Sequence, residues 1–114
     1  AYVLQKNLVH IHNNGIRLNN IIATGGGAKS PIWCQMYADI TGLPVRIPAE
    51  KEAACLGAAM IAAVADGKFA DFNDAAKELV SFTKEYTPNP CEHYERKYRR
   101  FCKLYEAALE INKI

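Results

Sequence analysis

Residues 21–33 read IIATGGGAKSPIW, and this stretch decides the fold. The apolar residues 21–23 predict a short strand buried on both faces, because the run is apolar without alternation. A helix is predicted to begin at Ser30 or Pro31, since serine is a favoured N-cap and proline a favoured first helical residue. The three glycines at 25–27 predict a tight turn between the strand and the helix.

A triple glycine is costly for stability, because glycine loses more backbone freedom on folding than any other residue. It is useful where the backbone must approach a ligand or adopt positive φ. A strand, a glycine turn and a helix together direct free backbone N–H groups and the positive end of a helix dipole toward one point, as many phosphate sites do. From the glycines alone, a phosphate-binding loop and a purely structural turn both remain open.

Two familiar phosphate-binding motifs do not match this loop. A Walker A motif ends in Gly-Lys-Ser or Gly-Lys-Thr and has another glycine five residues earlier. Ala28 and Ala23 occupy those two glycine positions. The dinucleotide motif G-x-G-x-x-G would use Gly25 and Gly27 and would then require a third glycine at position 30, which is Ser30. A phosphate loop here would therefore belong to a different class.

The segments around the loop predict a βαβ unit. An opening helix should end at the pair Asn14 and Gly15, and the helix after the loop should end at Gly42. Residues 43–48 predict a second strand, which should be parallel to the first and joined to it by a right-handed crossover. The helix face that we expect to pack on the sheet consists of Trp33, Met36, Tyr37 and Ile40.

A third helix, rich in alanine, is predicted over residues 50–66. Gly67 should end it, and Glu50 and Glu52 should lie in its first turn, where acidic side chains favour the positive helix end. A mid-helix glycine such as Gly57 costs up to about 1 kcal/mol relative to alanine, so we expect close packing or a ligand to offset it.

The remainder of the chain is predicted to form two helices with a connector between them. Residues 69–81 should be helical, capped by Asp71 or Asn73. Residues 82–90 are predicted to be a connector, because their prolines cannot continue a helix. The final helix is expected over residues 91–111. Its inward stripe consists of Tyr94, Tyr98, Phe101, Tyr105 and Ala108 or Leu109.

Charge and composition argue against nucleic-acid and membrane partners. The 114-residue chain has a formal net charge of only +2, so the basic run at 95–100 is interpreted as a solvated helix face. No apolar run reaches the roughly 18 residues of a membrane span. The first residues lack the layout of a signal peptide. We expect a cytoplasmic protein.

The sequence does not predict a metal site. The cysteines, which show no C-x-x-C spacing, are interpreted as reduced and mostly packed thiols; they are Cys34, Cys55, Cys91 and Cys102. His10 and His12 are two residues apart on a predicted helix, so they should point to different faces and not to one ion.

Two segments, residues 23–45 and residues 52–59, resemble the second signature and the following small-residue helix of the FGGY carbohydrate kinases. Both occur in the order and at the distance that the family shows, and the form GGGAKSxxW resembles the xylulokinase branch. The resemblance implies an α/β fold. It would be a parallel βαβ unit with packed helices, part of the second domain of an actin-like (ribonuclease H-like) ATPase fold. Residues 1–114 would be a C-terminal fragment of that nucleotide-binding domain.

The resemblance further implies an ATP-dependent sugar kinase that transfers a phosphoryl group from MgATP to a pentulose such as xylulose. ATP and Mg²⁺ would be its cofactors, and the alanine-rich helix would lie beside the adenine. The implied nucleotide-binding residues are Gly25, Gly26, Gly27, Lys29 and Ser30. Some relatives have a nucleotide-contacting asparagine where this chain has Pro31, so that contact is not expected here.

By the same resemblance, the catalytic base and the sugar-binding groups lie in a first domain that this chain lacks, so no catalytic residue is assigned. The fragment alone should be inactive. Its partners would be the missing N-terminal part of the enzyme and the sugar, and a homodimer remains open. Three alternatives remain: another sugar substrate (ribulose, gluconate or glycerol), a non-catalytic nucleotide-sensing module of actin-like type, and a plain scaffold segment.

Overall fold

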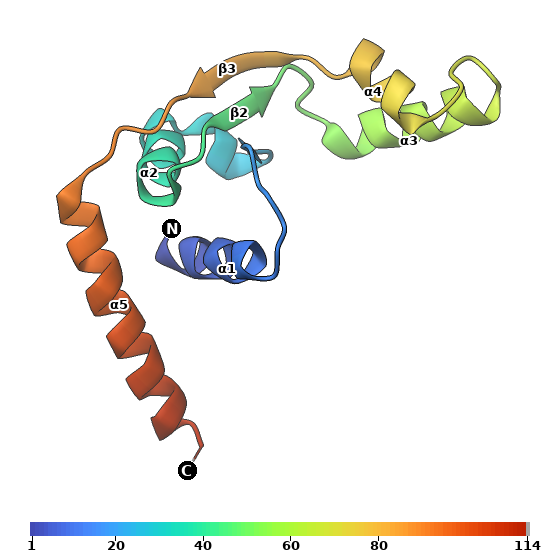
Figure 1. Cartoon of the computed structure of the whole chain (residues 1–114). Coiled ribbons are helices and arrows are strands. Elements are labelled where there is room, and N and C mark those ends of the chain that lie inside the picture. The colour runs from blue at the N-terminus through green and yellow to red at the C-terminus, as the bar shows by residue number, and fades with distance from the viewer. Residues whose placement is uncertain (114) are drawn as a thin grey trace.

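The computed structural model describes residues 1–113. Figure 1 shows its helices and strands in chain order. They are α1 (Tyr2–Asn13), β1 (Ile21–Ile22), the 3₁₀ turn η1 (Gly26–Lys29), α2 (Pro31–Thr41), β2 (Val45–Pro48), α3 (Ala53–Ala65), α4 (Phe72–Leu79), β3 (Phe82–Tyr86) and α5 (Glu92–Ile111).

The three strands form one mixed sheet in the order β1-β2-β3. β1 and β2 are parallel, with Ile21 opposite Val45, which confirms the predicted parallel pair. β3 runs antiparallel to β2 and places Tyr86 opposite Val45. The prediction that residues 82–90 form only a connector was therefore wrong. The prolines of that segment follow the strand, so they do not interrupt its hydrogen bonding with β2.

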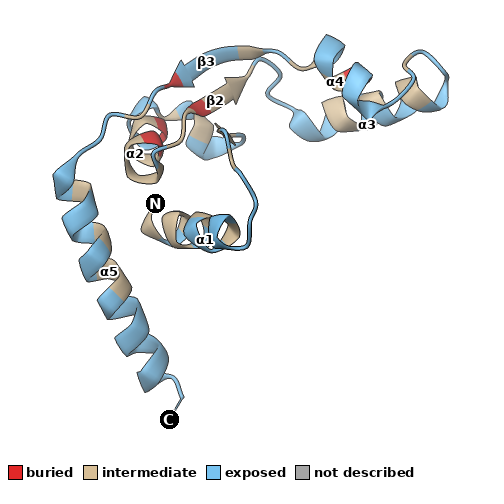
Figure 2. Cartoon of the chain, viewed as in Figure 1, coloured by how far each residue is buried: buried red, intermediate tan, exposed pale blue. Residues whose placement is uncertain are grey.

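The core lies between α2 and the sheet. Cys34, Ala38, Val45 and Tyr86 form one buried cluster, and Figure 2 shows how few buried residues the chain has. The predicted packing face of α2 was wrong in detail, because Trp33 is 48% exposed whereas Cys34 and Ala38 are fully buried. Small side chains occupy the contact line because the helix lies close to the strands.

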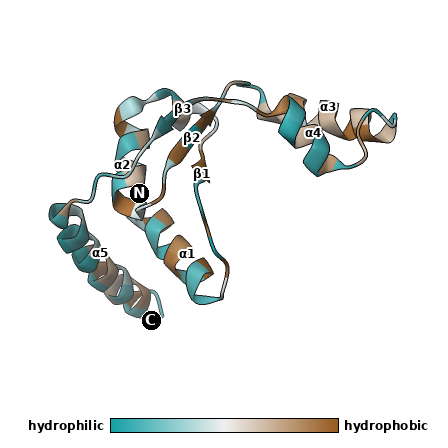
Figure 3. Ribbon diagram, turned by 45° about the horizontal axis from the view of Figure 1, so that its top comes forward, coloured by the Kyte–Doolittle hydropathy of each residue, from teal (hydrophilic) through white to brown (hydrophobic). Residues whose placement is uncertain are grey.

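β1 is less buried than its sequence suggests. Ile21 packs against the core, but Ile22 is 53% exposed, so the expectation of a strand buried on both faces was wrong. Alternate side chains of a strand point to opposite faces. Within residues 1–113, α2 covers only the face to which Ile21 belongs. Figure 3 shows β1 and β2 side by side as hydrophobic segments.

The molecule is elongated. Its radius of gyration is 17.8 Å, whereas a compact domain of about 100 residues has a radius near 13 Å. In Figure 1, α3 and α4 form a pair at one end, and α5 extends away from the sheet at the other. Ala75 of α4 is the one fully buried residue in this pair among the described residues.

Most helix ends follow the predicted local signals. Gly42 ends α2 in the left-handed conformation, and Gly67 has a φ of 77° just beyond α3. The carboxylate of Asp71 caps α4 by accepting a hydrogen bond from the Asp74 N–H at 2.9 Å. α3, however, begins at Ala53, so Glu50 and Glu52 precede its first turn and were placed wrongly.

The aromatic stripe of α5 faces α1 over part of its length. The rings of Tyr98 and Phe101 lie 6.0 and 5.7 Å from that of Tyr2. Farther along, Tyr105 and Leu109 are 37% and 46% exposed. The predicted stripe is therefore half-covered near the start of α5 and open near its end.

Candidate functional site

The glycine loop has a backbone that only glycine readily adopts. Gly25 has φ 76° and ψ −159°, a region that is essentially closed to other residues. η1 follows at once, and the hydroxyl of Ser30 caps α2 by accepting from the Trp33 N–H at 3.4 Å. The predicted cap at Ser30 and the predicted proline at the first helical position are both confirmed. Gly25 thus turns the chain out of β1 and into α2.

The outer surface of the loop is open. Within residues 1–113, the backbone N–H groups of Gly25, Gly26 and Gly27 donate no hydrogen bond to another protein group. A Cβ added at any of these three glycines would meet nothing within 4 Å. Unpaired N–H groups at an open turn are available to an anion.

The inner surface of the loop rests on Cys34. The thiol lies 3.6 Å from the carbonyl oxygen of Gly27 and 3.7 Å from that of Ala28. Burial raises the pKa of the Cys34 thiol, and the nearby Lys84 opposes this shift only in part, so the thiol stays protonated and able to donate. In a trans peptide the N–H points opposite to the preceding C=O. The Ala28 N–H therefore points away from Cys34.

A cavity of about 550 Å³ opens beside the loop. One wall is the loop and the other is the segment that leads from β2 to α3; its lining residues are Ala23, Thr24, Gly25, Gly26, Ala28, Lys29, Ile47, Pro48, Ala49, Glu50, Lys51, Glu52 and Thr83. Its volume lies within the range of small-molecule sites, roughly 300–1,000 Å³.

Some of the predicted site residues line the cavity and others do not. Gly25, Gly26 and Lys29 line it, whereas Gly27 and Ser30 do not. Sequence reasoning missed Ala28, whose place in the lining follows from the turn of η1. It also missed the whole second wall, because only the fold brings that wall opposite the loop.

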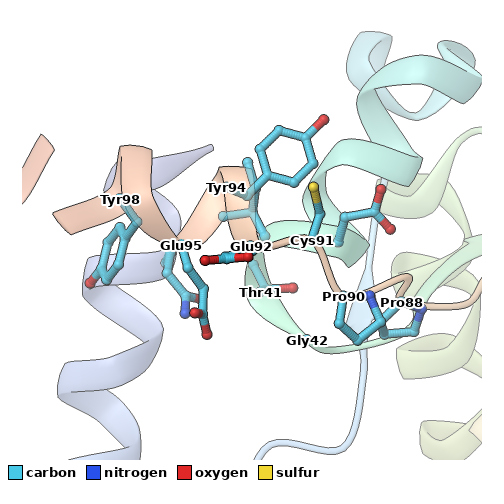
Figure 4. A pocket seen from close by; sticks show the side chains of 12 residues that line it. Thr41, Gly42, Pro88, Pro90, Cys91, Glu92, Tyr94, Glu95 and Tyr98 are labelled. Carbon is cyan, nitrogen blue, oxygen red and sulfur yellow. The ribbon is translucent and has the colours of Figure 1, made fainter. Parts of the chain in front are cut away.

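A second hollow, of about 580 Å³, lies between α1, α2 and the start of α5 (Figure 4). Asp39, Glu92 and Glu95 line it, and none of its lining residues is a lysine or an arginine. Three carboxylates repel phosphate. The cavity beside the glycine loop is therefore the candidate for an anionic ligand.

Other kinds of site find little support in the described residues. Residues 1–113 contain no group of three or more His, Cys, Asp or Glu side chains arranged to hold a metal ion. No helix among them combines the length and the hydropathy needed to cross a bilayer. The cysteines are all free, but only Cys34 is buried. Cys55 and Cys91 are exposed, so the expectation of mostly packed thiols was wrong.

Comparison with known proteins places the fold and the loop in a family. The model of the C-terminal domain of the FGGY family of carbohydrate kinases matches residues 1–65. The chain is 42% identical over 96 residues to the autoinducer-2 kinase of Enterobacter sp. (strain 638), and 40% identical to that of Klebsiella pneumoniae. These matches cover 83% of this chain but 18% of each relative, so the chain spans about a fifth of their length.

Solved structures agree with this assignment. The xylulose kinase from Lactobacillus acidophilus superposes with a TM-score of 0.84 at 27% identity, over 93% of this chain and 22% of the other. The gluconate kinase from the same organism superposes with a TM-score of 0.76 at 29% identity, over 83% of this chain and 20% of the other. The mixed sheet and its helices thus have the ribonuclease H-like fold of the C-terminal domain in these kinases. The chain belongs to the FGGY family of carbohydrate kinases, and its sequence corresponds to their C-terminal domain.

Proposed function

We propose that this chain is the nucleotide-holding part of an ATP-dependent carbohydrate kinase, which transfers the γ-phosphoryl group of MgATP to a sugar hydroxyl. The observation that carries the proposal is the glycine loop, whose unpaired N–H groups adjoin a cavity of nucleotide size. Membership of the FGGY family supports it.

Phosphoryl transfer depends mainly on positioning and on neutralising charge. Here the unpaired N–H groups of Gly25 and Gly26, which both line the cavity, would bind phosphate oxygens, and Gly25 would also allow the turn that presents them. Lys29 lines the same cavity and would add a positive charge. A hydrogen bond to a charged group contributes about 1.5–3 kcal/mol, so two or three of them hold a phosphate chain firmly only when other contacts add to them.

Two of the residues that the sequence predicted to bind the nucleotide have a structural role in this proposal. Gly27 has a free N–H but does not line the cavity, and its carbonyl faces Cys34. Ser30 is engaged with α2 as its cap. We therefore assign Gly27 and Ser30 to holding the loop in shape, with Gly25, Gly26, Ala28 and Lys29 at the ligand.

The catalytic base and the sugar-binding groups belong, in this proposal, to a preceding domain of a longer cytoplasmic polypeptide. The length of the relatives supports this division, since the chain covers only about a fifth of each. The isolated 114-residue chain should have no sugar kinase activity.

A pentulose such as xylulose is the first substrate candidate, supported by the structural similarity to xylulose kinases and by the GGGAKSxxW motif. The 42% identity to an autoinducer-2 kinase favours a second candidate, autoinducer-2.

The proposal is tested by calorimetric titration of the complete polypeptide with MgATP and MgADP, followed by assays with xylulose, gluconate and autoinducer-2. Saturable nucleotide binding with turnover on one of these acceptors supports a kinase. Binding without acceptor-stimulated turnover would favour the sensing module, and the absence of any nucleotide binding would leave only the scaffold.

A further inference from the structure

The wall of the cavity opposite the glycine loop carries a second lysine that the loop motif does not include. Lys51 lies between β2 and α3, two residues before α3 begins, and it lines the same cavity as Gly25, Gly26 and Lys29. From these positions we infer that Lys51 binds the phosphate chain of the nucleotide from the side opposite the glycine loop. This inference rests on the proposed function.

The backbone on both sides of Lys51 is held in place. The Ala49 N–H donates to the carbonyl oxygen of Ser81 at 2.9 Å, which ties the segment to the start of β3. The carboxylate of Glu50 accepts from the Glu52 N–H, also at 2.9 Å. A long flexible side chain on a fixed backbone can reach across the cavity at a low cost in backbone entropy.

The ammonium group of Lys51 is available for a ligand. Lys51 is exposed and forms no ion pair within residues 1–113. Lysine binds phosphate as a compact point charge, which suits a chain of phosphates whose exact orientation other groups decide. Lys29 and Lys51 come from the two walls of the cavity, so together they would flank the phosphates that the loop amides bind.

Glu50 and Glu52 line the same wall and limit the effect of Lys51 to short range. The two carboxylates offset the two lysines in formal charge, so the cavity has no general positive field that attracts every anion. The contribution of Lys51 must therefore be a direct contact. It should depend on the number of phosphates in the ligand and be absent for adenosine, which has none.

The test measures dissociation constants of the complete polypeptide for ATP, ADP and adenosine, each at two salt concentrations. Lys51→Ala should weaken ATP binding about tenfold, the equivalent of one charged hydrogen bond, and leave adenosine binding unchanged. Lys51→Arg, which keeps the charge, should retain most of the affinity. Lys68→Ala is the matched control, because Lys68 is an exposed lysine in the turn after α3, outside the cavity lining.

The outcomes separate this inference from the proposed function. If the unaltered protein binds ATP and Lys51→Ala binds it equally well, the role of Lys51 is refuted and the kinase proposal stands. An equal loss for ATP and adenosine in Lys51→Ala also refutes the phosphate contact, since it indicates a distorted wall. If the unaltered protein binds no nucleotide, both proposals fail together.

Discussion

The thiol of Cys34 lies 3.6 Å from the carbonyl oxygen of Gly27, and this contact joins the buried face of α2 to the glycine loop. Cys34 is only 1% exposed and belongs to the cluster that holds α2 on the sheet. The core of the domain and the orientation of the loop amides therefore depend on the same side chain.

Replacing Cys34 by alanine should reduce both stability and nucleotide affinity. The change removes a weak hydrogen bond and part of a buried side chain, so we expect a loss of about 1–2 kcal/mol in the free energy of unfolding. The loop loses its support, and ATP binding should weaken severalfold. Thermal denaturation and titration with ATP measure the two effects. Cys55→Ala is the control, because Cys55 is exposed on α3; equal behaviour of the two variants would contradict the coupling.

Alanine substitutions at two glycines of the loop should separate the effect of backbone strain on stability from the effect of ligand contact on affinity. Gly25→Ala places a side chain on a backbone with φ 76°, which costs about 1–3 kcal/mol, and it should also impair ATP binding. Gly26 does not have a positive φ, and the space around its Cβ position is open. Gly26→Ala should therefore fold normally and lose mainly its affinity for ATP.

Gly67→Ala completes this set as a control. Gly67 also has a positive φ, of 77°, but it lies beyond α3 and outside the cavity lining. The variant should lose stability and keep its affinity for ATP. Denaturant unfolding and calorimetry on the three variants measure this pattern. A Gly26→Ala variant as unstable as Gly25→Ala would show that the loop conformation was assigned wrongly.

The parts of the fold that follow from local chemistry were predictable from sequence. The caps at Ser30 and Asp71 and the left-handed residue Gly42 depend only on neighbouring residues. The parallel pairing of β1 and β2 follows from the strand–helix–strand order. The right-handed crossover stays a prediction.

The parts that depend on packing distance were not predictable. β3 was missed because the prolines beyond Tyr86 obscured the alternation of FTKEY, in which Tyr86 points into the core. The buried line of α2 fell on Cys34 and Ala38 instead of the large residues, since only the approach of helix to sheet decides which side chains fit. The wall that contains Lys51 faces the loop through the β2–β3 pairing and the tie to Ser81, and neither contact is visible from a local motif.

The thiols should differ in their reactivity. The thiolate of an accessible cysteine is the nucleophile that attacks an alkylating reagent. Cys55 and Cys91 are exposed and should be alkylated in the native protein, whereas Cys34 should react only after unfolding. Mass spectrometry of the labelled peptides before and after denaturation measures this. Rapid native labelling of Cys34 would show that α2 does not stay packed on the sheet.

The buried thiol of Cys34 makes the free energy of unfolding depend on pH. Burial raises the pKa of Cys34 above its value in the unfolded chain, with Lys84 acting in the opposite direction. A raised pKa means that the folded state favours the neutral thiol. The contribution of Cys34 is therefore complete below the pKa of the unfolded thiol, and it is lost as the pH rises toward the raised value. Unfolding of Cys34→Ala should show a smaller decline in stability over this alkaline range, and an identical decline would contradict the assignment.

Asp39 holds the segment between β3 and α5 onto α2. Its carboxylate oxygen Oδ1 accepts from Gln35 Nε2 at 2.7 Å and from the Asn89 N–H at 2.8 Å. Gln35 Nε2 also donates to the carbonyl oxygen of Thr87 at 2.9 Å. Asp39→Ala removes two hydrogen bonds to a charged acceptor, so the segment should loosen by about 1–3 kcal/mol.

Hydrogen exchange measures this loosening directly. In Asp39→Ala, protection of the Asn89 amide should fall by at least about tenfold, and protease cleavage near residues 87–91 should become faster. Asp39→Asn keeps an acceptor oxygen and should lose less. Asp66→Ala is the control, because the Asp66 side chain is exposed and makes no hydrogen bond within residues 1–113. If Asn89 is as protected in Asp39→Ala as in Asp66→Ala, α5 is positioned by its contact with α1 and not by Asp39.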